Sequence, residues 1–178
     1  TRLTVETPAG IKTLLLHTAG GKVQTVTVDM GRVAVGAPQT VTTTESTVRL
    51  TPVNMGNPHA VVFVDDAEKA PLATLGAALS VHPAFPDGVN VEFVSVTDST
   101  HLRMRVWERG SGVTLACGTG ACAAVAAAIA TGLCIKNTAV TVMLDGGALT
   151  VQVDGNGEVT MEGPAETVFE GEVADDAT

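Results

Sequence analysis

The segment that most constrains the fold is an uncharged, alanine-rich run that begins at Gly118. From Glu108 to Gly132 the sequence reads ERGSGVTLACGTGACAAVAAAIATG. The part after Cys117 carries Ala, Val and Ile on every side, which predicts a helix over about 118–131 with no face suited to water. Such a helix must be buried all round, and it is too short to span a membrane. We therefore expect strands to wrap around it.

Cys117 lies where this helix is expected to begin, and it is followed by glycines that leave room for a ligand. The unpaired N–H groups and the dipole of a helix start favour negative charge. They would stabilise a thiolate and could hold a ligand carboxylate. A free cysteine is more often a small buried hydrophobe. We interpret Cys117 as functional, and Cys122 and Cys134, which lack these surroundings, as core residues.

The rest of the chain is dominated by short alternating runs separated by glycine turns, which predicts strands and hairpins. One segment, LATLGAALS (72–80), instead has apolar residues at helical spacing. With roughly ten strands, one long buried helix and one short helix, the predicted fold class is α+β, a strand-rich shell around a central buried helix. The expected strands are RLTVET, IKTLLLH, VQTVTVDM, TVRLTPV, AVVFVDD, VNVEFVSVT, HLRMRVWE, TAVTVML, ALTVQV, EVTME and ETVFEG.

The net charge of −9 comes from one end of the chain. Residues 1–136 hold ten acidic and ten basic residues, whereas the residues after Lys136 include nine acidic and no basic ones. An acidic C-terminal portion argues against nucleic acid and anionic membranes as partners. The chain has three cysteines and no Cys or His cluster with zinc spacing, so we expect no bound metal. Reduced thiols fit a cytoplasmic protein better than a disulfide framework does.

Several polar residues outside the helix are ambiguous when taken singly. His59 follows the turn formers Gly-Asn-Pro and is most simply a partly exposed loop histidine. Asn90 is most simply a turn-capping amide. Glu108 and Arg109 are adjacent at a strand end, so their side chains should point to opposite faces. They could form a solvated ion pair at a rim, or they could bind a ligand ammonium and carboxylate respectively.

Three segments taken together, GNPHAVVFVDD, FPDGVNVEF and RVWERGSGVTLACGTGACAAV, closely resemble the latter half of the diaminopimelate epimerases. The resemblance runs from about Leu3 to Glu172. It implies the family's fold of two similar lobes, each a strand-rich shell around a central helix. By this resemblance, residues 1–31 are closing strands of a first lobe and residues 32–163 form the second lobe. Residues 164–178 are then a strand returning to the first lobe, followed by an acidic tail.

The resemblance also implies a cofactor-independent reaction, the epimerisation of LL-diaminopimelate to meso-diaminopimelate for lysine and peptidoglycan biosynthesis. Two cysteines, one from each lobe, exchange a proton on opposite faces of the substrate Cα. Carried over by position, Cys117 is one acid/base. The residues implied to bind the amino-acid substrate are Asn57, Asn90, Glu108, Arg109, Gly118 and Thr119, and His59 and Glu108 are implied to position or tune the thiols.

Two departures from the family pattern qualify this reading. Val113 stands where the family usually has a glutamate in the turn before the cysteine, which puts the geometry of that turn in doubt. The first lobe's cysteine is not found in this sequence. We therefore expect a partial chain with half an active site, whose partner is the missing first lobe and which could also form a homodimer. The alternatives are a racemase of the proline type and a non-catalytic anion-binding module.

Overall fold

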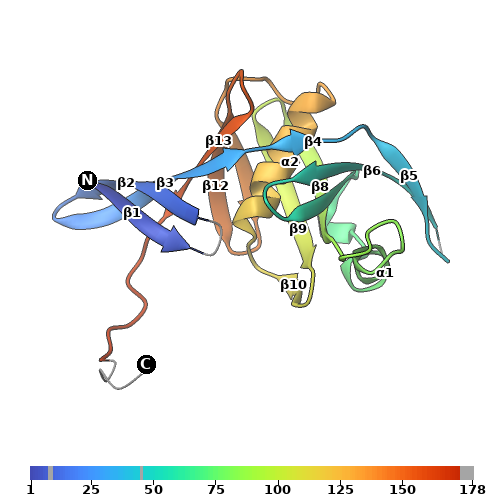
Figure 1. Ribbon diagram of the computed structural model, residues 1–178, viewed down its shortest axis with the longest axis horizontal. Coiled ribbons are helices and arrows are strands. Elements are labelled where there is room, and N and C mark those ends of the chain that lie inside the picture. The colour runs from blue at the N-terminus through green and yellow to red at the C-terminus, as the bar shows by residue number, and fades with distance from the viewer. Residues whose placement is uncertain (8–9, 45, 173–178) are drawn as a thin grey trace.

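The computed structural model describes residues 1–7, 10–44 and 46–172, and it consists of one mixed sheet curled around a helix (Figure 1). The described part contains thirteen strands, hydrogen-bonded in the order β1-β2-β3-β13-β12-β11-β9-β8-β7-β6-β4, with β10 on β9 and β5 on β6. The pairs β7–β8 and β9–β11 are parallel, and the other pairs are antiparallel. The strands are β1 (Arg2–Thr7), β2 (Gly10–Ala19), β3 (Lys22–Arg32), β4 (Ala34–Val35), β5 (Gln39–Thr42), β6 (Thr47–Asn54), β7 (Pro58–Phe63), β8 (Asn90–Asp98), β9 (His101–Glu108), β10 (Gly112–Thr114), β11 (Val140–Leu144), β12 (Gly147–Val153) and β13 (Glu158–Pro164).

The alanine-rich segment forms α2 (Gly118–Ala130) in the middle of the molecule, with strands on its different sides (Figure 1). It contacts strands from both arms of the sheet, β6–β9 and β11–β13. Nine consecutive residues, 120–128, are buried. Alanines let the strands approach closely, and this packing rather than helix propensity holds so short a helix together. The predicted α+β shell around a buried helix is confirmed. Within the described ranges, no helix is long and apolar enough to cross a membrane.

Strands β7, β8 and β9 present two different faces because side chains alternate along a strand. Val61, Val94 and Val106 belong to the main core, which surrounds α2. The opposite face of β7 and β8 carries Ala60 and Phe93, which belong to a second core. That second core is covered by the short helix α1 (Ala77–Ser80) and the π-helical turn before it (Leu72–Gly76), so the expected helix over 72–80 is present but irregular. Polar residues on the inner face therefore point towards α2.

The first three strands form an antiparallel meander, as expected, and extend from the body of the molecule (Figure 1). Through β13, which pairs with β3, they continue the same sheet. No described residue before Val41 is buried, and Leu3, Val5, Ile11 and Leu15 are 41–74% exposed. These strands thus have no core of their own. Their assignment as closing strands of a first lobe remains a prediction.

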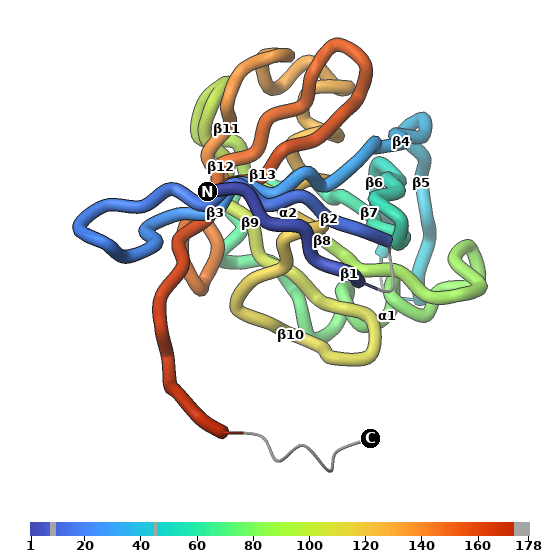
Figure 2. The backbone as a smooth tube through the Cα atoms, turned by 60° about the vertical axis from the view of Figure 1, so that its left-hand side comes forward, coloured from blue at the N-terminus to red at the C-terminus, as the bar shows by residue number. Residues whose placement is uncertain are grey.

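The strand expected over ETVFEG is not formed, and this prediction was wrong. Residues 165–172 leave the sheet as an extended segment (Figure 2), and Val168 and Phe169 are 89% and 84% exposed. The neighbouring strand β3 begins at Lys22, and the last backbone contact is Ala165 N–H to the Gln24 carbonyl. Only Val23 and Lys22 of β3 lie beyond that point, too few to pair with a whole further strand, so high strand propensity alone does not suffice. The rest of the expected acidic tail, residues 173–178, lies outside the described residues.

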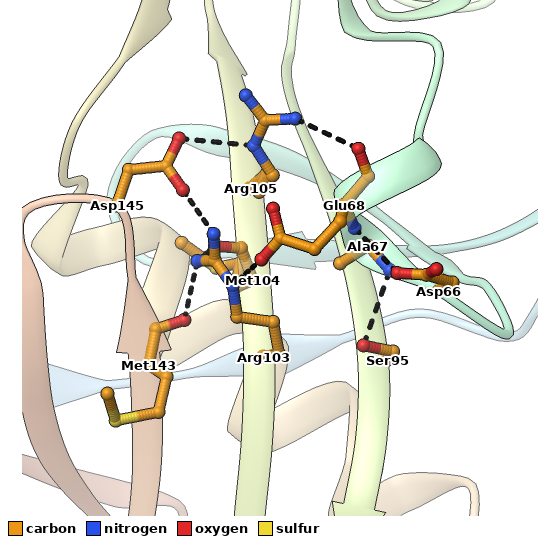
Figure 3. Close-up of polar contacts among 9 residues, drawn as sticks. All are labelled: Asp66, Ala67, Glu68, Ser95, Arg103, Met104, Arg105, Met143 and Asp145. Carbon is orange, nitrogen blue, oxygen red and sulfur yellow. Dashed lines mark hydrogen bonds and ion pairs between the residues drawn. The ribbon is translucent and has the colours of Figure 1, made fainter.

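An ion-pair cluster on the outer side of β9 joins two neighbouring turns to this strand (Figure 3). Arg103 donates from Nε to Glu68 Oε1 at 2.6 Å and from Nη2 to Asp145. Arg105 donates to Asp145 Oδ2 at 3.1 Å and to the Glu68 carbonyl at 3.3 Å. Asp145 thereby joins the β11–β12 turn to β9, and Glu68 joins the turn Ala67–Lys69 to it.

We expect Asp145→Asn to lower the free energy of unfolding by about 1–2 kcal/mol, because Asp145 is only 21% exposed and pairs with two arginines. The hydrogen bond from Arg103 is the main cause that lowers the pKa of Asp145 below its ordinary 3.8. A lowered carboxyl pKa stabilises the fold above the ordinary value, and this contribution is lost as pH falls through the folded pKa. Urea unfolding of wild type and Asp145→Asn at pH 7 and below pH 4 measures this contribution to the free energy of unfolding. The difference from wild type should shrink in acid, and Glu68→Gln, at a 61% exposed carboxylate, should cost less.

Candidate active site

The N-terminus of α2 is built around Cys117, which is the N-cap residue of the helix. Its backbone is extended, with φ −138° and ψ 107°, and its sulfur accepts a hydrogen bond from the Gly120 N–H at 3.4 Å. The side chain thus does what Ser or Asp does at most N-caps. Gly118 and Thr119 are the first two residues of the helix, and their N–H groups have no partner within it. The expected position of Cys117 at the mouth of a buried helix is correct.

The protonation of Cys117 differs from the expectation. Burial is the main cause that raises the pKa of the Cys117 thiol to about 11, whereas hydrogen bonds from Thr119 and Gly120 lower it. The residue is 7% exposed. Loss of hydration therefore outweighs the helix start, and the expected thiolate is not the resting form in this structure. Cys117 is a neutral thiol at pH 7.

The other two cysteines are placed as the sequence indicates. Cys122 is fully buried within α2, and Cys134 is 7% exposed beyond the end of that helix. Both belong to the main core. All three cysteines are free, and burial raises the pKa of Cys122 to about 12. Of the three, only Cys117 caps the start of α2.

His59 was wrongly expected to be a partly exposed loop residue. It lies in β7 on the inner face and is 1% exposed. Its Nδ1 is 2.6 Å from Glu92 Oε1, and its Nε2 is 3.0 Å from Asn57 Oδ1. The Gly-Asn-Pro turn does exist, with Gly56 at φ +99°, but it ends before His59 and turns the chain directly into β7.

Asn57 extends these contacts to the helix. Its amide nitrogen donates to Thr119 Oγ1 at 3.3 Å, and that hydroxyl is 3.6 Å from Cys117 Sγ. Glu92, His59, Asn57, Thr119 and Cys117 therefore form a continuous series, which we call the Glu92–Cys117 hydrogen-bond chain. It starts on β8 and ends at the start of α2. The resemblance placed four of these residues in the site, and the structure brings them together.

Glu92 was not singled out from the sequence. It is completely buried, between Val91 and Phe93 on β8, and it lies directly against the first turn of α2. Burial raises the pKa of this carboxyl above its ordinary value. The sequence did contain a signal for Glu92, since it is a lone acidic residue within an apolar strand. Such a residue is rarely buried without a specific partner, so its position indicates a buried polar contact.

Asn90, Glu108 and Arg109 lie at the adjoining ends of β8 and β9. Asn90 accepts a hydrogen bond from the Arg109 backbone N–H at 2.8 Å, so its amide does cap a backbone group. Glu108 accepts from Thr114 Oγ1 at 2.5 Å, and the Arg109 guanidinium donates to the Asp87 carbonyl at 2.5 Å. Glu108 and Arg109 thus have different partners, and the solvated ion pair considered from the sequence is not formed.

A hollow adjoins these residues on the Arg109 side, and its lining does not include Cys117. It has a volume of about 740 Å³, and its lining includes Phe85, Asp87, Trp107 and Arg109. Val113 lies in β10, which pairs with β9, and it is placed opposite Trp107 and is 46% exposed. The substitution of the family's glutamate by Val113 does not prevent this hairpin from forming.

Gly120 lies at the closest approach of α2 to the site, which makes it a direct test of this packing. A Cβ atom there would lie 2.9 Å from Glu92 Oε1 and 3.2 Å from Cys117 Sγ. Gly→Ala within a helix usually gains about 1 kcal/mol. We expect Gly120→Ala instead to destabilise the fold by about 1–3 kcal/mol, because both neighbours are held in place.

Gly118→Ala is the matched control for Gly120→Ala in urea unfolding. A Cβ atom at Gly118 would meet only the flexible end of Met161, at 3.2 Å. We expect this variant to stay within about 0.5 kcal/mol of wild type. Equal stabilities of the two alanine variants would contradict the tight contact at Gly120.

Comparison with solved structures defines the class of fold. A probable proline racemase from Agrobacterium radiobacter superposes with a TM-score of 0.76 and 22% identity, covering 99% of this chain and 61% of that one. A hydroxyproline epimerase from Agrobacterium vitis superposes with a TM-score of 0.70 and 21% identity, covering 92% of this chain and 56% of that one. The chain therefore has the fold of these racemases and epimerases.

Sequence comparison is more specific. The family model of diaminopimelate epimerase matches residues 51–168. The diaminopimelate epimerases of Bacillus pumilus and Bacillus subtilis are 45% and 44% identical to this chain, in alignments that cover 96% of it. The chain belongs to the diaminopimelate epimerase family. It spans about 65% of the length of each of these relatives.

Proposed function

We propose that this chain contributes one acid/base cysteine and most of the substrate contacts to a cofactor-independent diaminopimelate epimerase, which converts LL-diaminopimelate to meso-diaminopimelate. The observation that carries the proposal is Cys117 at the start of α2, with the side chains of Asn57 and Thr119 gathered around it. The relatives with about 45% identity, all named diaminopimelate epimerase, support the choice of substrate. Such a role places the chain in lysine and peptidoglycan precursor biosynthesis, in the cytoplasm.

In the proposed reaction, a thiolate on one face of the substrate removes the proton from Cα. The electron pair left on Cα is delocalised into the adjacent carboxylate, which the N–H groups of Gly118 and Thr119 stabilise. A thiol on the opposite face then donates a proton to Cα, which inverts the centre and leaves that cysteine as the thiolate. Cys117 is a neutral thiol in this structure, and that is the form required of the proton donor.

The second acid/base must come from outside these 178 residues. Cys122 and Cys134, the other two cysteines, are core residues, one inside α2 and one beyond its end. Neither can face Cys117 across a substrate carbon. The chain also spans only about 65% of its relatives. We infer that the remaining part, a first lobe with its own cysteine, is the partner that completes the site, and homodimerisation is a further possibility for the whole enzyme.

Glu108 and Arg109 distinguish the proposed substrate from that of a proline-type racemase. Diaminopimelate carries a second amino-acid end, with an ammonium and a carboxylate, whereas proline carries neither. Glu108 is the last residue of β9, Arg109 follows it at the rim of the site, and Arg109 lines the adjoining hollow. A non-catalytic anion-binding module would need neither residue, nor a buried chain of hydrogen bonds ending at a thiol.

The experiment that tests the function uses the completed protein, by which we mean this chain combined with the part of the Bacillus subtilis relative that it does not match. Conversion of LL-diaminopimelate to the meso form is followed by chiral chromatography, with L-proline as the competing substrate. We expect conversion of diaminopimelate alone. Racemisation of proline would favour a racemase of the proline type. Binding of diaminopimelate without conversion of either compound would favour a non-catalytic binding module.

Arg109→Lys should lower kcat/KM of the completed protein for diaminopimelate by about 10²-fold. Lysine keeps the charge but loses the planar fork that holds a carboxylate through two hydrogen bonds. Lys69→Arg, on an exposed turn away from the site, is the control and should leave kcat/KM unchanged. Normal kinetics of Arg109→Lys would show that Arg109 does not bind the substrate carboxylate and only contacts Asp87 at the rim.

A further inference from the structure

Glu92 has no role in the reaction described above, yet its burial is costly. The carboxyl lies on the inner face of β8, with no exposure to solvent. An acidic side chain in such a place strongly destabilises the fold unless its environment compensates. An apolar residue would fill the same space on β8 without this cost. The retention of a carboxyl here therefore calls for a specific explanation.

The contacts of Glu92 favour a neutral carboxyl. Oε1 is 2.6 Å from His59 Nδ1, while no donor among the described residues reaches Oε2. A carboxylate would leave half its negative charge on a dry, unpaired oxygen, which is unfavourable. The neutral acid, by contrast, donates its O–H to Nδ1. His59 is then neutral and carries its own proton on Nε2.

The proton on His59 Nε2 determines the direction of the next hydrogen bonds in the Glu92–Cys117 hydrogen-bond chain. The Nε2–H of His59 must point at an acceptor, so Asn57 turns its carbonyl oxygen towards it, at 3.0 Å. The amide nitrogen of Asn57 then faces Thr119 Oγ1 and donates to it, at 3.3 Å. The Thr119 hydroxyl, which accepts from Asn57, keeps its own proton free to donate to Cys117 Sγ, 3.6 Å away.

We propose that Glu92 is a positioning residue, which acts through His59, Asn57 and Thr119 to hold a hydroxyl donor on the sulfur of Cys117. Its role in catalysis rests on the function proposed above, but its effect on the thiol does not. A donor held on sulfur stabilises the thiolate that forms when Cys117 gives up its proton, and it fixes the direction of the S–H in the resting thiol. The same residues would thus set both the geometry and the acidity of the acid/base.

A direct charge effect of Glu92 on Cys117 is the competing account, and it has the opposite sign. An ionised Glu92, close to the sulfur, would raise the thiol pKa by repulsion, as would Glu108, which also faces this region. Removing Glu92 would then make Cys117 more reactive. Under the proposal, removing Glu92 releases the hydroxyl donor and makes Cys117 less reactive.

The protonation of His59 can be measured in the unmodified chain. Its imidazole ¹⁵N chemical shifts, read by NMR at pH 7, should show a neutral ring with the proton on Nε2. A proton on Nδ1 with a bare Nε2 would reverse the direction of the hydrogen bonds and overturn the proposal. An imidazolium would overturn it as well, because Glu92 would then be ionised.

Reactivity of the thiol provides the second test. The rate of Cys117 alkylation by iodoacetamide is followed between pH 7 and pH 10, with peptide mapping to separate the three cysteines. We expect Glu92→Leu and Thr119→Val each to slow it by about three- to tenfold, which corresponds to a rise of half to one unit in the thiol pKa. Glu92→Gln can still donate to Nδ1, so it should stay within about twofold of wild type.

The double variant Glu92→Leu/Thr119→Val identifies the route. If Glu92 acts through Thr119, the double variant is no slower than Thr119→Val alone. Effects that multiply, or a Glu92→Leu or Glu92→Gln variant that reacts faster than wild type, would overturn the proposal. If Glu92→Leu does not fold, Glu92→Gln and the His59 shifts decide the matter. None of these readouts requires turnover, so they remain informative even if the proposed epimerase activity is not found.

Discussion

Cys117→Ser is expected to abolish epimerisation by the completed protein, with kcat falling by at least about 10²–10⁴-fold. The hydroxyl of serine is far less acidic than a thiol, so it can neither give a proton to a carbanion at a useful rate nor act as the base in the reverse direction. The shape of the site is preserved, because serine is a favourable N-cap and can accept the Gly120 N–H in place of sulfur. The loss should therefore appear in kcat, with unfolding in urea unchanged.

The matched control for this variant is Cys134→Ser. Cys134 is as little exposed as Cys117, at 7%, but it lies beyond the opposite end of α2. A modest loss of stability is expected from placing a hydroxyl in the core, together with near-normal kcat. Retention of most of the activity by Cys117→Ser, or an equal loss in both variants, would show that the α2 start is not where the proton is transferred.

The elements of the fold could be predicted from the sequence because each depends on a local pattern. An alanine-rich run without charge predicts a helix buried on all sides, and α2 is such a helix. Alternating runs with glycine turns predict hairpins, and β1–β3 form them. The segment after Pro164 fails because a strand also needs a partner, and β3 starts only two residues beyond the last contact at Gln24. Whether a strand finds a neighbour to pair with depends on the tertiary structure, and a local sequence pattern does not contain that information.

The candidate site could likewise be predicted only in part from the sequence. The position of Cys117 follows from the helix, but its pKa depends on the depth of burial and on Glu92, which is 25 positions earlier in the chain. His59 follows a turn motif and reads as a loop residue, yet the parallel pairing of β7 with β8 places it on the inner face beside Glu92. These relations arise only when the strands are assembled around α2.

The second large effect concerns the chain by itself: the 178-residue polypeptide is expected to fold around α2 but to show no epimerase activity. Inversion of a carbon centre requires a donor and an acceptor on opposite faces, and the start of α2 presents Cys117 from one face only. Exchange of the Cα proton without inversion should also be negligible, because exclusion of water and positioning of the substrate require a closed site. The exposed apolar residues of β1 and β2 are available for pairing with the missing part.

The most direct measurement of the central claim is the turnover of LL-diaminopimelate in D₂O by three samples of matched concentration. These are the chain alone, the chain mixed with the separately expressed remaining part of the Bacillus subtilis relative, and the same mixture with Cys117→Ser. Formation of meso-diaminopimelate and deuterium at Cα are read by chiral chromatography and mass spectrometry. The account predicts both signals in the second sample only. Robust turnover by the chain alone would contradict it.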